Sequence, residues 1–375
     1  MKVKNYAMNN LKGVLAFLVV IHHAFLAYTT SGYASQVVDP QNFIGFDYIT
    51  FYLDNFFMFA FFMISGFFVY NSISCRGPVK YVLSRLLKLG IPFIIGTYII
   101  NFFGIYIKDS IVLNFPINAE SLKYYWSVVK GMLIGQHLWF LWVLLAFNIL
   151  ILLIHLLTKK FSNKFFIYTK PWTQIILLVV MAAIFYRISI QFLGTEFIRL
   201  VGPLTFQGGR IAVYFIIFIF GYLIGKAGID KTFLGKESPY KKYWYIYLLT
   251  GLVLVIFVYL IVYNFKFVPL YEFAAIMNSA AFIITPIGFI LLFNRMFSSE
   301  NKFLGLLGDN AFGIYIIHYS IVLIFQALFL RIYIPGLIKG LSVALISYIV
   351  SFTLTYAFRK SKDIIKSNIT KKGTL

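Results

Sequence analysis

Residues 246–263 read IYLLTGLVLVIFVYLIVY, and residues 273–293 read FAAIMNSAAFIITPIGFILLF. Neither run contains a charged side chain, and each is long enough to cross a bilayer as a helix, which takes about 20 residues. A helix pairs all of its own backbone polar groups, so it is the economical form for an apolar segment in lipid. The two runs therefore predict an all-α integral membrane protein.

The composition extends this prediction to the whole chain of 375 residues. Hydrophobic residues make up 61% of it and charged residues 12%, about half the share of a soluble domain. The mean hydropathy is +0.86. Reading outward from the two runs gives ten predicted spans, near residues 11–30, 48–71, 86–107, 138–157, 172–192, 211–228, 244–263, 273–293, 311–330 and 341–358.

Positive charge alternates between rich and poor loops along these spans. With both termini in the cytoplasm, about 24 Lys and Arg fall in cytoplasmic segments and about 8 outside, as the positive-inside rule requires. Arg187 is left within the membrane. The net charge of +21 is thus explained by topology, and no nucleic-acid partner is expected. We expect a multi-pass protein of the plasma membrane, with the lipid bilayer as its main surroundings.

Residues 1–375 are predicted to form one polytopic domain, because the longest outside loop, about 108–137, is too short for a separate catalytic domain. No internal repeat is visible, which weakens an inverted-repeat transporter interpretation. A single cysteine, Cys75, cannot build a metal cluster by itself, and no metal is expected. Gly221 and Gly225 form a GxxxG pattern, which we interpret as ordinary close helix packing.

Polar and ionisable side chains within spans are costly and are functional candidates by default. The candidates are His22, His23, Asp54, Ser65, Arg187, Tyr315 and His318. Lys12 and His23 are eleven positions apart, so they share a helix face to within roughly 20° and lie about 16 Å apart along the axis. This predicts a cation at the cytoplasmic entry and an imidazole near mid-membrane. His22 points about 80° away from that face; alternatively, both histidines only make hydrogen bonds between helices.

A cytoplasmic anion site is predicted where the second and third spans meet the cytoplasm. Arg85 and Lys88 lie one turn apart at the start of the third span, and Arg76 and Ser65 lie toward the same side of the membrane. Two cations there can hold the phosphates of a cytoplasmic donor. The alternative, equally open from the residues alone, is that they are positive-inside anchors.

Five segments together resemble the acyltransferase 3 family of integral membrane acyltransferases, particularly its glucan-modifying type. They match, in order, a basic residue followed by ten residues and a His, then Phe-Phe-x-x-Ser-Gly-Phe, a basic helix entry ending in Pro, His-Leu-Trp-Phe-Leu, and Gly-x-Tyr-x-x-His. The segments are Lys12–His23, Phe61–Phe67, Arg85–Pro92, His137–Leu141 and Gly313–His318.

The resemblance implies O-acyl transfer, commonly of acetyl or succinyl, from cytoplasmic acyl-CoA (acetyl-CoA above all) to a carbohydrate outside, such as a cell-surface glycan. It implies that His23 is the catalytic histidine and that Lys12 is its basic partner. The chain departs from the pattern with Lys at positions 12 and 88, where Arg is commoner. An Arg side chain can form two parallel hydrogen bonds with a phosphate, whereas Lys offers only a point charge. No SGNH-type domain follows the last span, so we expect transfer to be completed in the membrane part.

Chemistry allows His23 to act as general base or as covalent carrier of the acyl group, and the sequence leaves both open. His318 and Tyr315, one turn apart, are expected to orient substrate, and Asp54 to pair with His23 or Arg187.

We also expect His137, Trp139, Arg187 and Arg210 to contact the acceptor, with His137 and Trp139 near the outer surface. The rival interpretations are an exporter of polysaccharide or lipid-linked sugar, and an acyltransferase with a lipid or peptide acceptor. An exporter would tolerate loss of His23.

Overall fold

The computed structural model describes residues 5–32, 35–132, 134–157, 164–265 and 270–372. Most of these residues are helical, and a single short hairpin supplies the strands in the described part. The α-helices are α1 (Tyr6–Leu26), α2 (Gly45–Asp54), α3 (Phe57–Phe67), α4 (Val69–Arg76), α5 (Pro78–Arg85), α6 (Ile91–Ile95), α7 (Phe102–Leu113), α8 (Ala119–Val129), α9 (Trp139–Leu157), α10 (Lys164–Tyr168), α11 (Pro171–Leu193), α12 (Ile211–Ala227), α13 (Trp244–Tyr259), α14 (Tyr271–Met296), α15 (Lys302–Phe329) and α16 (Gly336–Lys372).

Shorter elements join or interrupt these helices. Three are π-helical turns, four are 3₁₀ turns, and two strands form an antiparallel hairpin between α11 and α12 that the sequence reasoning did not anticipate. They are η1 (Leu86–Gly90), η2 (Gly96–Asn101), η3 (Gln136–Leu138), η4 (Gly208–Arg210), η5 (Ile229–Lys231), η6 (Pro239–Tyr243), η7 (Leu260–Phe265), β1 (Phe197–Val201) and β2 (Leu204–Gln207).

Within the described ranges, ten helical segments are long and apolar enough to cross a membrane, and they correspond one to one with the predicted spans. Several boundaries differ from the prediction: the third and ninth spans start at Pro78 and Lys302 rather than near 86 and 311, and both ends of the chain differ as well. The first helix begins at Tyr6 rather than near residue 11, because the Asn5 side chain accepts a hydrogen bond from the Met8 amide and caps it. The last helix continues to Lys372.

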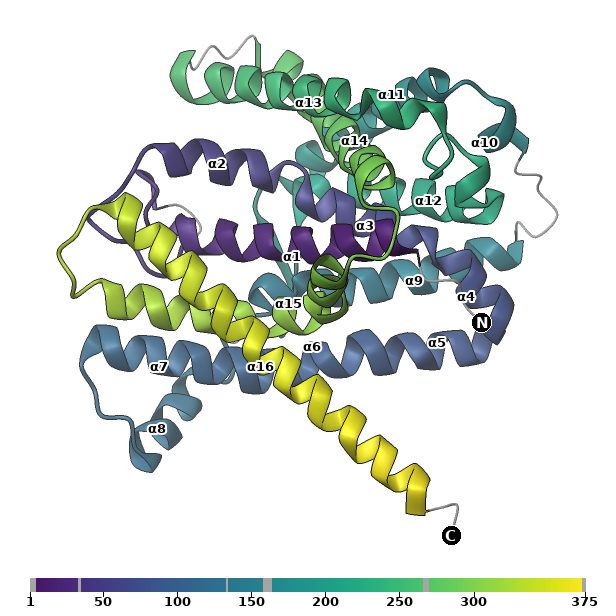
Figure 1. Ribbon diagram of the computed structural model, residues 1–375. Coiled ribbons are helices and arrows are strands. Elements are labelled where there is room, and N and C mark those ends of the chain that lie inside the picture. The colour runs from purple at the N-terminus through teal and green to yellow at the C-terminus, as the bar shows by residue number, and fades with distance from the viewer. Residues whose placement is uncertain (1–4, 33–34, 133, 158–163, 266–269, 373–375) are drawn as a thin grey trace.

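Figure 1 shows that α1 begins and α16 ends at the same end of the bundle, as an even number of spans requires. We call this the terminal end and the other the loop end. The last part of α16 projects beyond the other helices at the terminal end (Figure 1). The loop end carries the segment before α2, the loop containing α8, and the β1–β2 hairpin.

The centre of the bundle is α1, which packs along α15 and touches α3, α14 and α16. Two glycines bring α1 and α15 together: a Cβ on Gly13 would come within 2.6 Å of the Gly308 backbone nitrogen. Farther along, the Gln326 amide donates to the His23 carbonyl at 2.9 Å. The two helices therefore run parallel and in close contact, which aligns the polar positions of the first and ninth spans.

A second close pair is formed by α3 and α12. A Cβ on Gly221 would meet the Met63 carbonyl oxygen at 2.3 Å, and one on Gly225 would meet that of Phe67 at 2.2 Å. From the other side, a Cβ on Gly66 would meet the Phe218 carbonyl oxygen at 2.3 Å. The interpretation of the GxxxG pattern as close helix packing is therefore confirmed, and it also accounts for the glycine in the 61–67 segment.

The third span contains two π-helical turns, and such turns often lie at functional sites. The second ends at Asn101, whose amide donates to the Gly135 carbonyl at 3.4 Å. The Ser320 hydroxyl of α15 bonds to the Asn101 side chain at 3.3 Å. The irregular turn thus ties the third span, the start of the fourth and α15 together at one level.

Candidate active site

Three histidines from distant parts of the chain meet inside the bundle at the level of these turns. His23 comes from α1, His137 from η3 and His318 from α15. The ring centroids of His23 and His318 lie 5.3 Å apart, those of His137 and His318 4.7 Å, and those of His23 and His137 6.2 Å. We call these three residues the histidine cluster. The sequence predicted a functional role for each of these three histidines but did not predict that they lie together.

The backbone fixes the tautomers of two members of the histidine cluster. Nε2 of His137 lies 2.9 Å from the Tyr315 carbonyl oxygen, and Nδ1 of His318 lies 2.8 Å from the same oxygen. A carbonyl oxygen only accepts, so each of these nitrogens carries the proton in the neutral ring. The other nitrogens, Nδ1 of His137 and Nε2 of His318, are therefore acceptors; both are buried, and no described residue donates to them.

His23 differs from its two neighbours because it is half-buried as a residue while they are buried, and no carbonyl bonds to its ring. Its Nδ1 is buried without a hydrogen-bond partner among the described residues. The Tyr319 ring lies 5.1 Å from the His23 ring. His23 is thus the member of the cluster that can reach a substrate, while two acceptor nitrogens stand beside it.

The depth of His23 corrects the expectation of a mid-membrane position. It is the eighteenth of the 21 residues of α1, one turn before the helix ends. The shift arises because α1 starts and ends about four to five residues earlier than predicted. Its side chain leans back toward the helix start, as helical side chains do, and meets His318 from just past the middle of α15. The histidine cluster therefore lies in the loop-end half of the bundle.

His22 lies on a different side of α1 from the histidine cluster, as its spacing predicted. Its ring contacts the Phe57 ring at 5.1 Å and the His23 ring at 5.2 Å. Only 8% of His22 is exposed, and no described residue bonds to its Nδ1. His22 is thus packed between α1 and α3 without access to a substrate space.

Two residues expected to contact the acceptor, His137 and Trp139, are buried. They lie at the loop end, where the fourth span starts, but only 6% and 7% of them are exposed. The Trp139 ring packs against Tyr214 at 5.5 Å, within the core. The Tyr315 hydroxyl donates to the His137 carbonyl, so it anchors the segment that carries His137. The short 3₁₀ turn η3 at the start of the fourth span draws His137 and Trp139 inward.

The expected partners of Asp54 are also corrected. Its carboxylate is bound by Arg210, at 2.7 Å, and not by His23 or Arg187. The Arg210 guanidinium also lies 5.1 Å from the Phe282 ring centroid, and 11% of its side chain is exposed. Sequence reasoning missed the pair because 156 residues separate its members and η4 brings Arg210 back to the end of α2.

Arg187, the other predicted partner of Asp54, pairs with a different carboxylate. It forms an ion pair with Glu272 at 2.8 Å, and both side chains are at least half exposed. Glu272 lies in the first turn of α14, and Arg187 lies six residues before the end of α11. The pair therefore sits toward the loop end of α11 and α14.

The terminal end holds the predicted donor-binding residues. The Arg85 guanidinium donates to the Ser72 hydroxyl at 3.1 Å and lies 4.9 Å from the Tyr81 ring centroid. Its Nε is buried without a described partner. Arg76 donates to the Ser84 hydroxyl. Two guanidinium groups are thus held half-buried by neutral hydroxyls, and no carboxylate in the described part of the chain neutralises either of them.

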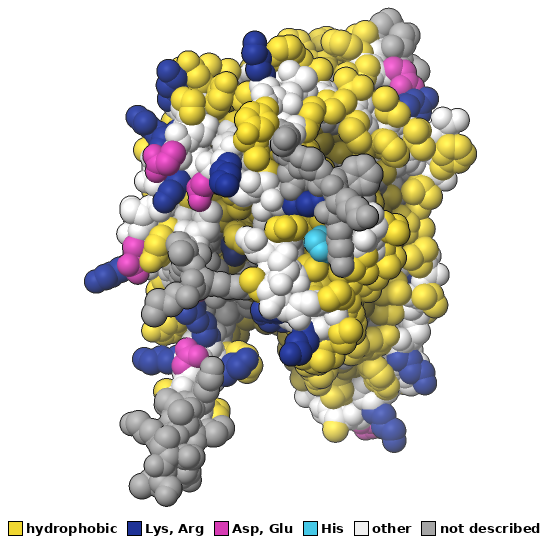
Figure 2. Space-filling view, turned by 90° about the vertical axis from the view of Figure 1, so that its right-hand side faces the viewer, with side chains coloured by type: hydrophobic (Ala, Val, Ile, Leu, Met, Phe, Trp, Pro, Cys, Tyr) yellow, Lys and Arg dark blue, Asp and Glu magenta, His cyan; other side chains and the backbone are white. Residues whose placement is uncertain are grey.

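The other predicted residues of this group lie around these two arginines. Lys12 has its Nζ 5.7 Å from the Phe68 ring centroid, and Phe68 lies one turn beyond Ser65, which is half-buried. Lys88 is exposed in η1. Figure 2 views the terminal end and shows Lys and Arg side chains gathered over this face, between flanks that are mainly hydrophobic. This end is therefore electropositive.

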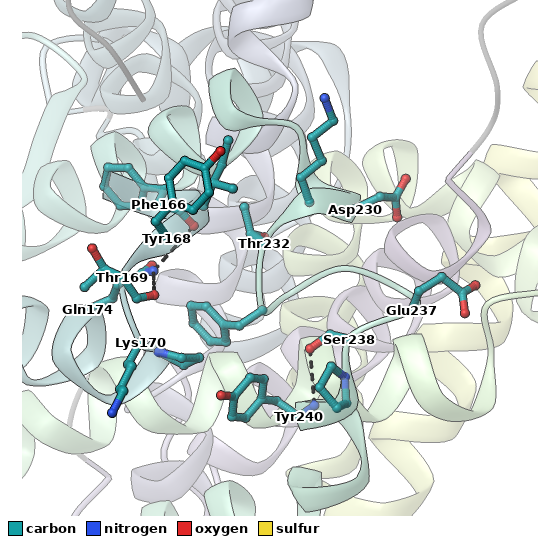
Figure 3. Close-up of a pocket in the computed structure, with 15 residues that line it drawn as sticks. Phe166, Tyr168, Thr169, Lys170, Gln174, Asp230, Thr232, Glu237, Ser238 and Tyr240 are labelled. Carbon is teal, nitrogen blue, oxygen red and sulfur yellow. Dashed lines mark hydrogen bonds between the residues drawn. The ribbon is translucent and has the colours of Figure 1, made fainter. Parts of the chain in front are cut away.

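One cavity lies apart from all of these residues. It has a volume of about 420 Å³ between α10, the start of α11 and the 230–240 segment, as Figure 3 shows. The Gln174 amide donates to the Thr169 carbonyl at 3.0 Å, and the Ser238 hydroxyl accepts from the Tyr240 amide at 3.2 Å. These groups hold the backbone of the walls, and no predicted site residue lines the cavity.

Across the ranges that the structure describes, no three His, Cys, Asp or Glu side chains are arranged to hold a metal ion. The chemical groups that the structure brings together are the His23 imidazole beside two acceptor imidazoles, with cations at one end of the bundle. The family model described as an acyltransferase domain matches residues 5–360. Searches of curated proteins and of solved structures find no match.

Proposed function

Because the chain belongs to the acyltransferase 3 family, we propose that it is a plasma-membrane O-acyltransferase that moves an acyl group from cytoplasmic acyl-CoA to a hydroxyl of an extracytoplasmic carbohydrate. The acyl group is acetyl or succinyl, and the acceptor is a cell-surface glycan of the glucan type. The observation that carries the proposal is that the His23 ring lies beside the unpartnered acceptor nitrogens of His137 and His318, while His23 itself is only half-buried as a residue.

The chemistry assigned to the histidine cluster follows from its tautomers. No hydrogen bond joins the His23 ring to its neighbours in the structure, but the unpartnered nitrogens of His137 and His318 lie beside it. If the His23 ring turned so that one N–H donated to either of them, its other nitrogen would be left unprotonated. A third group that orients the base in this way is a recurring feature of nucleophile activation.

The reaction balances with His23 as a general base. His23 removes the proton from the acceptor hydroxyl, whose oxygen bonds to the thioester carbonyl carbon. The carbon–sulfur bond then breaks, and the proton passes from His23 to the departing thiolate, so the products are an ester and free CoA. In the alternative route His23 itself first accepts the acyl group, and the hydroxyl attacks that acyl-imidazole.

Donor binding is assigned to the terminal end, which we place in the cytoplasm on the charge distribution of the loops. Arg76 and Arg85 present guanidinium groups whose fork geometry suits phosphate oxygens. Lys12 adds a point charge on α1, the helix that carries His23. A donor with its phosphates at this end can extend its thioester toward the histidine cluster.

The test measures both products of the reaction. Purified protein in proteoliposomes receives acetyl-CoA or succinyl-CoA with gluco-oligosaccharides, and the assay follows release of free thiol together with acylated sugar by mass spectrometry. Stoichiometric thiol and ester support the proposal. Movement of the sugar across the bilayer without thiol release would identify an exporter. Mass spectrometry of surface glycans from cells with and without the gene would then identify the acceptor, and an unchanged glycan beside an acylated lipid or peptide would correct its class.

A further inference from the structure

A smaller cavity opens at the loop end beside the histidine cluster. It has a volume of about 190 Å³, roughly the space of six water molecules, and is formed by α7, α8 and the segments before α2 and η3. Its lining combines aromatic, aliphatic and amide side chains, and none of these described residues carries a charge. The lining residues are Gln36, Phe102, Ile105, Tyr125, Val129, Met132, Ile134 and Gln136.

One lining residue connects this cavity to the reactive ring. The Gln136 side-chain oxygen accepts a hydrogen bond from the Tyr319 hydroxyl at 3.4 Å, and the Tyr319 ring lies 5.1 Å from both His23 and His137. Gln136 has a φ of 47°, a left-handed conformation that non-glycine residues adopt at a cost. The strained backbone turns its side chain to the cavity while the next residue, His137, enters the histidine cluster.

The aromatic wall of the cavity is fixed by contacts outside it. The Tyr125 hydroxyl donates to Asp109 at 2.5 Å, and Lys108 pairs with the other oxygen of Asp109 at 2.5 Å. Burial and the bond to Asp109 raise the pKa of Tyr125, so this hydroxyl stays a donor. The Tyr106 hydroxyl donates to the Asn118 carbonyl at 3.3 Å and ties down the start of α8. The cavity is therefore built before any ligand arrives.

We propose that this cavity binds one neutral monosaccharide unit of the acceptor and presents its hydroxyl to His23. The inference rests on the proposed function. It adds where the acceptor binds and that the bound sugar unit is uncharged. A sugar ring has apolar C–H faces that pack on aromatic rings such as Phe102 and Tyr125, and hydroxyls that bond to amides such as Gln36 and Gln136. Because the lining carries no charge, the carboxylate of an acidic sugar would lose its water here without gaining a counter-ion, so an acidic sugar should bind more weakly.

The experiment compares a lining aromatic with a matched residue on the same helix. Tyr125→Leu removes the ring from the wall, whereas Tyr124→Leu changes a neighbour that is 73% exposed and does not line the cavity. Acceptor KM, acyl-CoA KM and thiol release are measured with a methyl glucoside and with the corresponding glucuronide. Binding of the methyl glucoside alone is followed by saturation-transfer NMR on the full chain in nanodiscs.

We expect Tyr125→Leu to raise the acceptor KM about tenfold and to weaken the NMR signal, with acyl-CoA KM unchanged and Tyr124→Leu like the wild type. The glucoside should be preferred to the glucuronide. Normal acceptor KM in an active, folded Tyr125→Leu protein would overturn the assignment, as would an altered preference for acyl-chain length, which would make the cavity an acyl pocket. Failure of the wild type to release thiol would instead refute the proposed function.

Discussion

Replacing His23 with Ala is expected to remove the proposed chemistry and to leave the fold of the first span intact. His23 is half-buried as a residue, and its Nδ1 makes no hydrogen bond to a described residue, so truncation breaks no such bond there. Its carbonyl, which accepts from Gln326, is retained. We therefore expect the protein to insert and fold, with a loss of stability within the ordinary range of about 0.5–3 kcal/mol.

The expected loss of activity is much larger. Removing a general base costs about 10²- to 10⁴-fold in rate, or roughly 3–5 kcal/mol of transition-state stabilisation. Loss of a covalent carrier would cost more. His22→Ala is the matched control, because His22 neighbours His23 in sequence but packs against Phe57. We expect its turnover to stay within about tenfold of the wild type, as for a packing defect.

The assay follows thiol release and ester formation by purified variants at matched concentration, after size-exclusion chromatography has confirmed folding. A stopped reaction also tests for acylated protein in His318→Ala, where a carrier mechanism would accumulate acyl-His23. Near-normal turnover in folded His23→Ala would refute the catalytic assignment and favour the exporter. Equal losses of activity in His23→Ala and His22→Ala would contradict the distinction between an accessible His23 and a packed His22.

Four further outcomes are expected. Arg85→Ala should raise the KM for acyl-CoA about tenfold and leave that for the acceptor unchanged, and equal effects on both would make Arg85 an anchor. His318→Ala should lower kcat about 10-fold or more without changing donor KM, since its free nitrogen orients His23; an unchanged kcat argues against this role. The exposed Cys75 should react with an impermeant maleimide only in permeabilised cells, and labelling of intact cells would reverse the topology. Lys339→Ala should destabilise the protein by about 3–5 kcal/mol in thermal unfolding, because it leaves the Asp39 carboxylate buried and unpaired, whereas the double change of both residues should cost less.

The number of spans was readable from the sequence because hydrophobic length is a local property. Each run of about 20 apolar residues has to pair its own backbone in lipid, whatever surrounds it. The GxxxG pair was readable for a similar reason, since a missing side chain permits close approach of any neighbouring helix. The boundaries of α1 were less accurate, because the Asn5 cap decides where that helix starts.

Within the site, helical spacing predicted which side of α1 His23 occupies, and it separated His23 from His22. Helical spacing did not predict that His23 meets His137. That contact depends on η3 and on the π-helical turn η2, where the Asn101 amide bonds to the Gly135 carbonyl, and regular helix geometry does not predict such turns. The Asp54–Arg210 pair was missed for the same kind of reason, since its members meet only when a hairpin returns the chain to the end of α2.

The sequence by itself determined the class of protein, the ten crossings and the residues whose polarity is costly in a membrane. Only the tertiary structure decided which of those residues meet, which are paired, and which remain accessible. The physical reason is that apolar burial acts on each segment separately, whereas a hydrogen bond or ion pair requires two groups within about 3 Å, and that distance is set by packing across the bundle. His23 was a candidate by its position within a span, and only the tertiary structure placed it beside two acceptor nitrogens from spans far along the chain.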